Sequence, residues 1–141
     1  MASSGVEALI ERLSQVPWPS SDVARPLALL TRCPEAGETP LVDVPQLAEL
    51  AGVGAVHIKD ERGRMGLGSF KALGAAYVIA RDAEDGQARG HTYVTASAGN
   101  HGMSVAAGAR VFGARAVVYI AETVPEAFAE RLRSQGAEVR R

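Results

Sequence analysis

The chain has 141 residues, 47% of them hydrophobic, and a formal net charge of −1, which suits one globular domain. Its charges are of both signs and mixed, so nothing predicts a nucleic acid or an anionic membrane as partner. No apolar run is long enough to span a bilayer, and the first residues lack the cationic start of a secretory signal. Cys33 is the only cysteine, which excludes an internal disulfide and favours a reducing, cytoplasmic compartment.

Residues 1–38 are predicted to form an arm of helix and loop laid over a larger body. Apolar residues recur at helical spacing within residues 5–15, at Val6, Leu9, Ile10 and Leu13. A proline- and serine-rich loop follows, then a weak helical or extended piece over Leu27–Leu30. Two prolines and a glycine in residues 32–40 indicate a further loop.

From residue 39 to residue 141 the pattern alternates between strands and helices. Helices are predicted over 44–51, 69–82, 100–112 and 125–135, and strands over 55–58, 92–95, 116–120 and 137–139. This alternation predicts an α/β domain with an open parallel sheet and helices on both faces. Ligands bind such sheets at the carboxyl ends of the strands. Two glycine-containing loops, 59–70 and 97–102, are expected there.

Lys71 is the first candidate for chemistry. Ser69 is expected to cap the helix that follows, so Lys71 falls in a first turn where the helix dipole disfavours a cation. Residues that break a local rule are expected at functional sites. Burial and positive potential would favour a neutral amine, which can form a Schiff base with an aldehyde cofactor such as pyridoxal phosphate. The residues alone leave open a surface lysine beside Asp60 and Glu61.

The loop S-A-G-N-H-G, residues 97–102, is the second candidate. Gly99 allows a tight turn and close backbone approach. The amides that begin the next helix lack partners within it, and with the helix dipole they form an anion site of the right size for a carboxylate. Asn100 can donate a hydrogen bond from its side-chain amide, whereas His101 receives no role in proton transfer. The alternative is a plain helix cap with glycines for packing.

Three motifs together resemble the fold type II pyridoxal-phosphate enzymes. They are Thr39-Pro40-Leu41, the segment G-S-F-K-A-L-G-A-A-Y after K-D-E-x-x-R, and S-A-G-N-H-G. This superfamily includes threonine and serine dehydratases, threonine synthase, serine racemase and diaminopropionate ammonia-lyase, and the resemblance runs from about Gly37 to the last residue. It implies pyridoxal 5'-phosphate as cofactor, held by Lys71, Phe70 and Asn100. It implies a substrate site formed by Ser97, Ala98, Gly99, Asn100 and His101, and no metal.

The resemblance also implies a reaction. Lys71 would hold the cofactor, then remove the α-proton of a small amino acid, and loss of a β-substituent would yield a keto acid and ammonia. Ala98 resembles the dehydratase pattern, where racemases carry serine and ammonia-lyases aspartate. The K-D-E-x-x-R segment is closest to the ammonia-lyase pattern. The two clues disagree, so the substrate stays open.

The chain is much shorter than members of this superfamily. The later glycine-rich loop for the cofactor phosphate and the residue facing the pyridine nitrogen have no counterpart among its motifs. We therefore expect a truncated piece or one part of a longer enzyme, acting as a homo-oligomer or with a complementing chain. One alternative is an inactive module that binds another chain through an exposed sheet edge. Another alternative is a nucleotide-binding domain. It is the weaker of the two, because Gly66 and Gly68 lack the spacing of a P-loop or dinucleotide motif.

Overall fold

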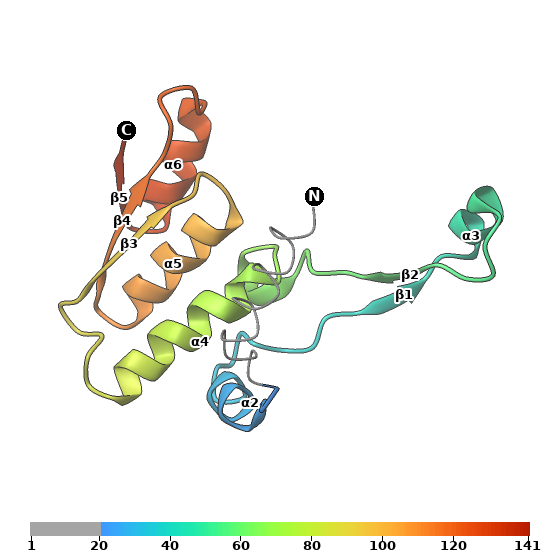
Figure 1. Cartoon of the computed structure of the whole chain (residues 1–141), viewed down its shortest axis with the longest axis horizontal. Coiled ribbons are helices and arrows are strands. Elements are labelled where there is room, and N and C mark those ends of the chain that lie inside the picture. The colour runs from blue at the N-terminus through green and yellow to red at the C-terminus, as the bar shows by residue number, and fades with distance from the viewer. Residues whose placement is uncertain (1–20) are drawn as a thin grey trace, which may run out of the picture.

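A computed structural model describes residues 21–141 (Figure 1). The helices are α2 (Ala24–Leu30), α3 (Pro45–Ala51), α4 (Lys71–Glu84), α5 (Asn100–Val111) and α6 (Glu126–Ser134), with a short 3-10 turn, η1 (Arg64–Gly66). The strands are β1 (Leu41–Asp43), β2 (His57–Lys59), β3 (Thr92–Ala96), β4 (Arg115–Tyr119) and β5 (Ala137–Arg140). The helix predicted within residues 5–15 lies outside the described residues. Among residues 21–141, no helix combines the length and apolar character needed to cross a membrane.

Strands β3, β4 and β5 form the expected parallel sheet, with β4 in the centre. Thr92 pairs with Arg115 at one end of the β3–β4 ladder, and Ala116 pairs with Ala137 between β4 and β5. The connections run through α5 and α6, as parallel strands require. The predicted parallel α/β architecture is therefore confirmed.

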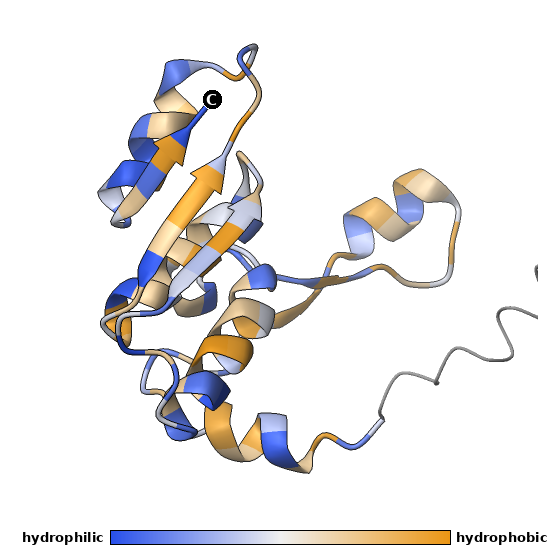
Figure 2. Cartoon of the chain, turned by 60° about the vertical axis from the view of Figure 1, so that its left-hand side comes forward, coloured by the Kyte–Doolittle hydropathy of each residue, from blue (hydrophilic) through white to orange (hydrophobic). Residues whose placement is uncertain are grey.

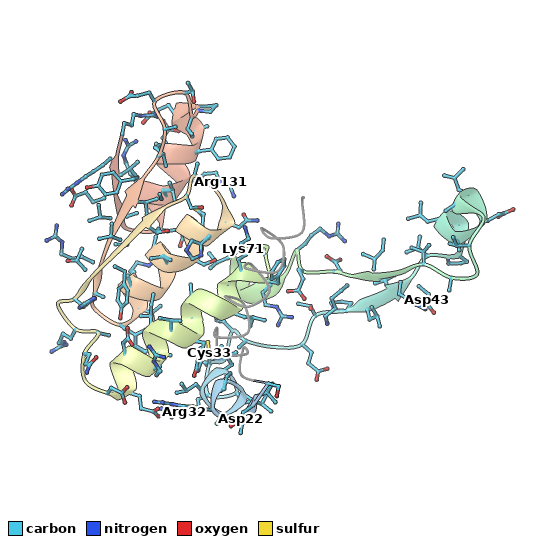
Figure 3. The ribbon with its side chains drawn as sticks, in the orientation of Figure 1. Asp22, Arg32, Cys33, Asp43, Lys71 and Arg131 are labelled. Atoms are coloured by element: carbon cyan, nitrogen blue, oxygen red, sulfur yellow. The ribbon has the colours of Figure 1, made fainter. Side chains whose placement is uncertain are left out.

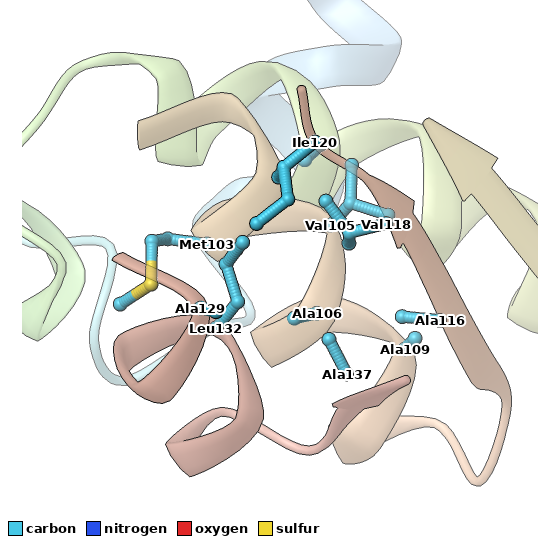
Figure 4. Close-up of a cluster of buried hydrophobic side chains, with 11 residues drawn as sticks. Met103, Val105, Ala106, Ala109, Ala116, Val118, Ile120, Ala129, Leu132 and Ala137 are labelled. Carbon is cyan, nitrogen blue, oxygen red and sulfur yellow. The ribbon is translucent and has the colours of Figure 1, made fainter. Parts of the chain in front are cut away.

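The core lies between this sheet and helices α5 and α6 (Figure 4). Ala116 and Val118 of β4 and Ile120 just after it share one face, against which Leu132 of α6 is fully buried. On the opposite face Val94 of β3 is 63% exposed, although its partner Val117 in β4 is buried. The helix packing in the core of the described chain is thus on one side of the sheet.

Strand β2 departs from the prediction. It pairs antiparallel with β1, Leu41 opposite Lys59, in a separate two-stranded sheet, so the expectation that it joins the parallel sheet is wrong. The seven-residue helix α3 ends at Gly52, whose φ of +66° turns the chain back toward β1. Strand β1 has only three residues, too few for an alternating apolar pattern to be recognised in the sequence. This β1–α3–β2 hairpin extends away from the body of the chain (Figure 1).

Helices α4 and α5 lie side by side, and Figure 1 shows them running in the same direction. A Cβ on Gly108 would lie 2.9 Å from Cδ1 of Ile79, so only glycine leaves room for this isoleucine as it stands. Each of these residues lies eight positions beyond the first residue of its helix. Because the helices run in the same direction, their first turns lie at the same end of the pair.

Candidate functional site

The start of α4 carries Lys71 as its first residue. Phe70, rather than the expected Ser69, occupies the N-cap position, so the helix begins two residues later than predicted. Ser69 is 7% exposed, and its Oγ accepts a hydrogen bond from the backbone N–H of Lys71 at 3.3 Å. The serine hydroxyl thus satisfies a first-turn amide, as its position in the sequence suggested.

The Lys71 side chain is exposed (Figure 3), and the burial expected from the sequence is wrong. Side chains on a helix tilt toward its N-terminus, so the first residue extends beyond the helix end rather than into the α4–α5 contact. Within residues 21–141 its amine makes no hydrogen bond or ion pair. Phe70 beside it is also 63% exposed.

The alternative interpretation placed Lys71 on the surface beside Asp60 and Glu61, but neither acid makes an ion pair with it. Asp60 accepts two hydrogen bonds from the Arg62 guanidinium, at 2.9 and 2.6 Å, and Glu61 is bound by Arg64. These hydrogen bonds lower the pKa of both carboxyl groups to about 2. Each carboxylate already has a cationic partner, so the charge of Lys71 is left uncompensated by them.

The start of α5 lacks a side-chain cap. The first helical hydrogen bond runs from Met103 N to Gly99 O at 3.2 Å, so the backbone N–H groups before Met103 have no partner within the helix. Gly99, Asn100 and His101 are exposed, whereas Ser97 and Ala98 are half-buried. At the turn, Gly99 N donates a long hydrogen bond to Ser97 Oγ at 3.4 Å, and the Ser104 hydroxyl donates to the Asn100 carbonyl at 2.7 Å. This arrangement can accept an anion.

Gly102, and not Gly99, is the glycine that the backbone requires here. A Cβ on Gly102 would lie 2.2 Å from the Ser97 carbonyl oxygen, which no side chain can tolerate. A Cβ on Gly99 would meet nothing within 4 Å, and its φ of −107° is open to other residues. Within the described chain the close backbone contact is therefore at Gly102, where the loop folds back over the first turn of α5.

The structure brings the two candidate segments together in part. The exposed amine of Lys71 and the uncapped start of α5 lie at the same end of the α4–α5 pair (Figure 1). No hydrogen bond joins Lys71 or Phe70 to residues 97–101 in the described chain. Among the described residues, the site is thus an open surface with an unpaired amine and a helix start whose first N–H groups lack helical partners.

Sequence reasoning missed the role of Arg64. Arg64 is 8% exposed, and its guanidinium donates hydrogen bonds to Glu61, Thr39 and the carbonyl of Gly37. The arginine was visible in the K-D-E-x-x-R motif, three residues after the glutamate. Its other partners lie 25 and 27 residues away, so only the fold reveals them.

Comparison with known proteins decides the family. A sequence model described as "Pyridoxal-phosphate dependent enzyme" matches residues 33–141. The chain belongs to this pyridoxal-phosphate dependent family. The sequence-based resemblance is therefore confirmed, and pyridoxal phosphate is the cofactor of the family.

Relatives within this family include two kinds of ammonia-releasing enzyme. The chain is 33% identical to diaminopropionate ammonia-lyase of Salmonella typhimurium, over 79% of this chain and 33% of that protein. It is 36% identical to human L-serine dehydratase/L-threonine deaminase, over 73% of this chain and 30% of that protein.

Solved structures agree with this family assignment. Diaminopropionate ammonia-lyase from Escherichia coli, in complex with an aminoacrylate–pyridoxal-phosphate azomethine intermediate, matches with a TM-score of 0.72 and 32% identity. The match covers 83% of this chain and 32% of that one. A pyridoxal 5'-phosphate-dependent aspartate racemase matches with a TM-score of 0.76, 26% identity and coverage of 89% and 39%. The chain thus spans about a third of the length of the relatives it matches.

Proposed function

We propose that this chain carries the lysine-bearing part of a pyridoxal-phosphate-dependent lyase that releases ammonia from a small amino acid. One observation carries the proposal: the Lys71 amine, unpaired among residues 21–141, lies at the same end of the α4–α5 pair as the uncapped start of α5. The family membership and the ammonia-lyase and dehydratase relatives support the same reaction class. Because the chain spans a third of those relatives, we propose that it works as one part of a longer enzyme in the cytoplasm.

The described residues fit the reactive end of the cofactor. Lys71 offers an exposed primary amine to an aldehyde, and the exposed ring of Phe70 offers an apolar surface beside it. Asn100 at the start of α5 has a side-chain amide that can donate to a ring oxygen. When bound, pyridoxal phosphate supplies an electron sink for charge that develops on the substrate α-carbon.

The residues of this chain then have separate roles. The Lys71 amine takes the proton from the substrate α-carbon, which requires it to be neutral at that moment. The N–H groups at the start of α5 bind the substrate carboxylate, and Ser97, Ala98, Gly99, Asn100 and His101 shape this site. Ala98 has no acid or base, so it cannot move a proton. Loss of the proton and of a β-substituent leaves an enamine, and water then hydrolyses its imine tautomer to a keto acid and ammonia.

A test of this proposal uses the two lysines of the chain. Wild-type protein mixed with pyridoxal phosphate should gain an absorbance band that borohydride fixes onto Lys71. Lys71→Ala should lose the band, because no other side chain offers a free amine at this helix start. Lys59→Ala is the matched control and should keep it, since the Lys59 ammonium is held by the Thr39 carbonyl. A band that persists in Lys71→Ala would contradict the assignment.

A second candidate function is an inactive module that binds another protein chain. The β1–α3–β2 hairpin favours it, because it carries hydrophobic residues (Figure 2) whose side chains are exposed, including Leu41 at 67%, Leu50 at 84% and Val53 at 52%. A flat absorbance spectrum together with self-association in analytical ultracentrifugation would support this function over the first. Association alone would not, since a homo-oligomeric or complemented enzyme would also associate.

A further inference from the structure

Arg64 is the most fully engaged charged side chain near the proposed lysine. Its Nε and Nη2 donate to the two carboxylate oxygens of Glu61 at 2.7 and 2.9 Å. Nη1 donates to the Gly37 carbonyl at 2.7 Å, and Nη2 also donates to the Thr39 hydroxyl at 2.8 Å. That hydroxyl in turn donates to Glu61 at 2.6 Å. A planar guanidinium is required for this set, because an ammonium cannot present parallel donors to a carboxylate and two further acceptors.

The backbone immediately after Arg64 is strained. Met65 has a φ of +49°, the only non-glycine residue with positive φ in residues 21–141, and Gly66 and Gly68 have φ of +66° and +73°. A left-handed methionine persists only where the surroundings hold it. The Arg64 carbonyl accepts from Leu67 N at 2.9 Å and Gly68 N at 3.3 Å, so the turn is anchored on Arg64. Ser69 and Lys71 follow directly.

We propose that Arg64 is a positioning residue for Lys71. It ties the segment Gly37–Thr39 to the loop before α4, and this tie holds the left-handed turn that fixes where α4 begins. The Lys71 amine is thereby kept beside the start of α5. This inference rests on the function proposed for Lys71 and adds a residue that acts on it without touching it.

The neighbouring Arg62 provides a matched comparison. It also makes a two-pronged ion pair, with Asp60, but its side chain is 90% exposed and, among the described residues, makes no hydrogen bond to Thr39 or to residues 65–68. A general effect of losing an arginine–carboxylate pair would appear at both positions. A positioning effect would appear only at Arg64.

The experiment measures where pyridoxal phosphate attaches. Each variant of the 141-residue chain is treated briefly with pyridoxal phosphate and borohydride, and mass spectrometry gives the ratio of labelled to unlabelled Lys71. Label on Lys59 is measured separately and is not the reference, because Thr39, whose carbonyl holds Lys59, is itself a partner of Arg64. Arg64→Lys should lower the ratio by about tenfold, as expected for a small displacement of a reacting group. Arg62→Lys should leave it unchanged.

A second variant separates positioning from folding. In the Arg64→Lys background, Met65→Gly removes the cost of the left-handed conformation, so it should recover part of the Lys71 label. Circular dichroism melting of each variant confirms that the chain is folded. An unchanged ratio in Arg64→Lys, with wild type labelled at Lys71, overturns the positioning role alone. Wild type without preference for Lys71 overturns the proposed function itself.

Discussion

At the scale of single residues, two adjacent acids each have an arginine of their own. Glu61 is the more enclosed, and hydrogen bonds from Arg64 and then Thr39 lower its pKa from 4.5 to about 2. A carboxyl group whose pKa is lower in the folded chain than in the unfolded chain stabilises the fold only while it is ionised. The loop before Lys71 should therefore lose stability as the pH falls and Glu61 becomes protonated.

This gives a prediction for Glu61→Gln. Above pH 4.5 the variant should have a lower free energy of unfolding than wild type, because the charge-assisted bonds to Arg64 are weakened. The gap should narrow as pH falls from 4.5 to about 2, where the wild-type carboxylate is itself protonated. Urea unfolding followed by circular dichroism across this range measures it. A difference in the free energy of unfolding that does not change with pH would show that the stabilisation does not come from the ionised form of Glu61.

At the scale of elements, α5 depends on small residues at two contacts. Gly102 lies under the Ser97 carbonyl, and Gly108 lies against Ile79 of α4. The first contact folds the S-A-G-N-H-G loop onto its helix, and the second sets how closely the two helices approach. The glycines near the start of α5 are therefore not interchangeable.

Gly102→Ala should lower the free energy of unfolding by about 1–3 kcal/mol, because the new methyl group overlaps a backbone oxygen and cannot be relieved by a rotamer change. Gly74→Ala in α4 is the matched control, since its Cβ would meet nothing within 4 Å. It should stabilise the chain by about 0.5–1 kcal/mol through helix propensity. Chemical denaturation of both variants checks the opposite signs. Equal effects would mean that the Ser97–Gly102 contact is not tight in solution.

Much of this element structure was predictable from the sequence, and the exceptions have physical causes. The parallel strands and their helices were recognisable because their apolar residues follow a regular period and Gly136, with φ of +92°, ends α6 as expected. The antiparallel pairing of β2 was not, because a three-residue partner has no period to detect. Lys71 and the start of α5 followed from motifs. The exposure of Lys71 and the contacts of Arg64 depend on tertiary packing that no local pattern contains.

At the scale of the whole molecule, the described chain divides into a packed body and an exposed hairpin. Leu132 in the body is fully buried and lies beside Gly102 in the first turn of α5, while Leu50 on the hairpin is 84% exposed. The stability of the chain should therefore depend on the body far more than on the hairpin.

Leu132→Ala should reduce the free energy of unfolding by about 2–5 kcal/mol, the usual cost of a large cavity in a core. Leu50→Ala should change it by no more than about 0.5 kcal/mol, because that side chain is already in water. Thermal and urea unfolding of the two alanine variants measure this contrast. A large loss in Leu50→Ala would mean that the hairpin is covered in solution, which would favour the chain-binding function.

The Gly108–Ile79 contact has a mechanical consequence for the chemistry. It lies eight residues from the start of each helix, about 12 Å along the axis at 1.5 Å per residue. If both helices are rigid, this contact sets the distance between their first turns, and so the distance between the Lys71 amine and the start of α5. A methyl group added at Gly108 would push the two first turns apart, so we expect the reactivity of Lys71 to depend on a residue far along the neighbouring helix.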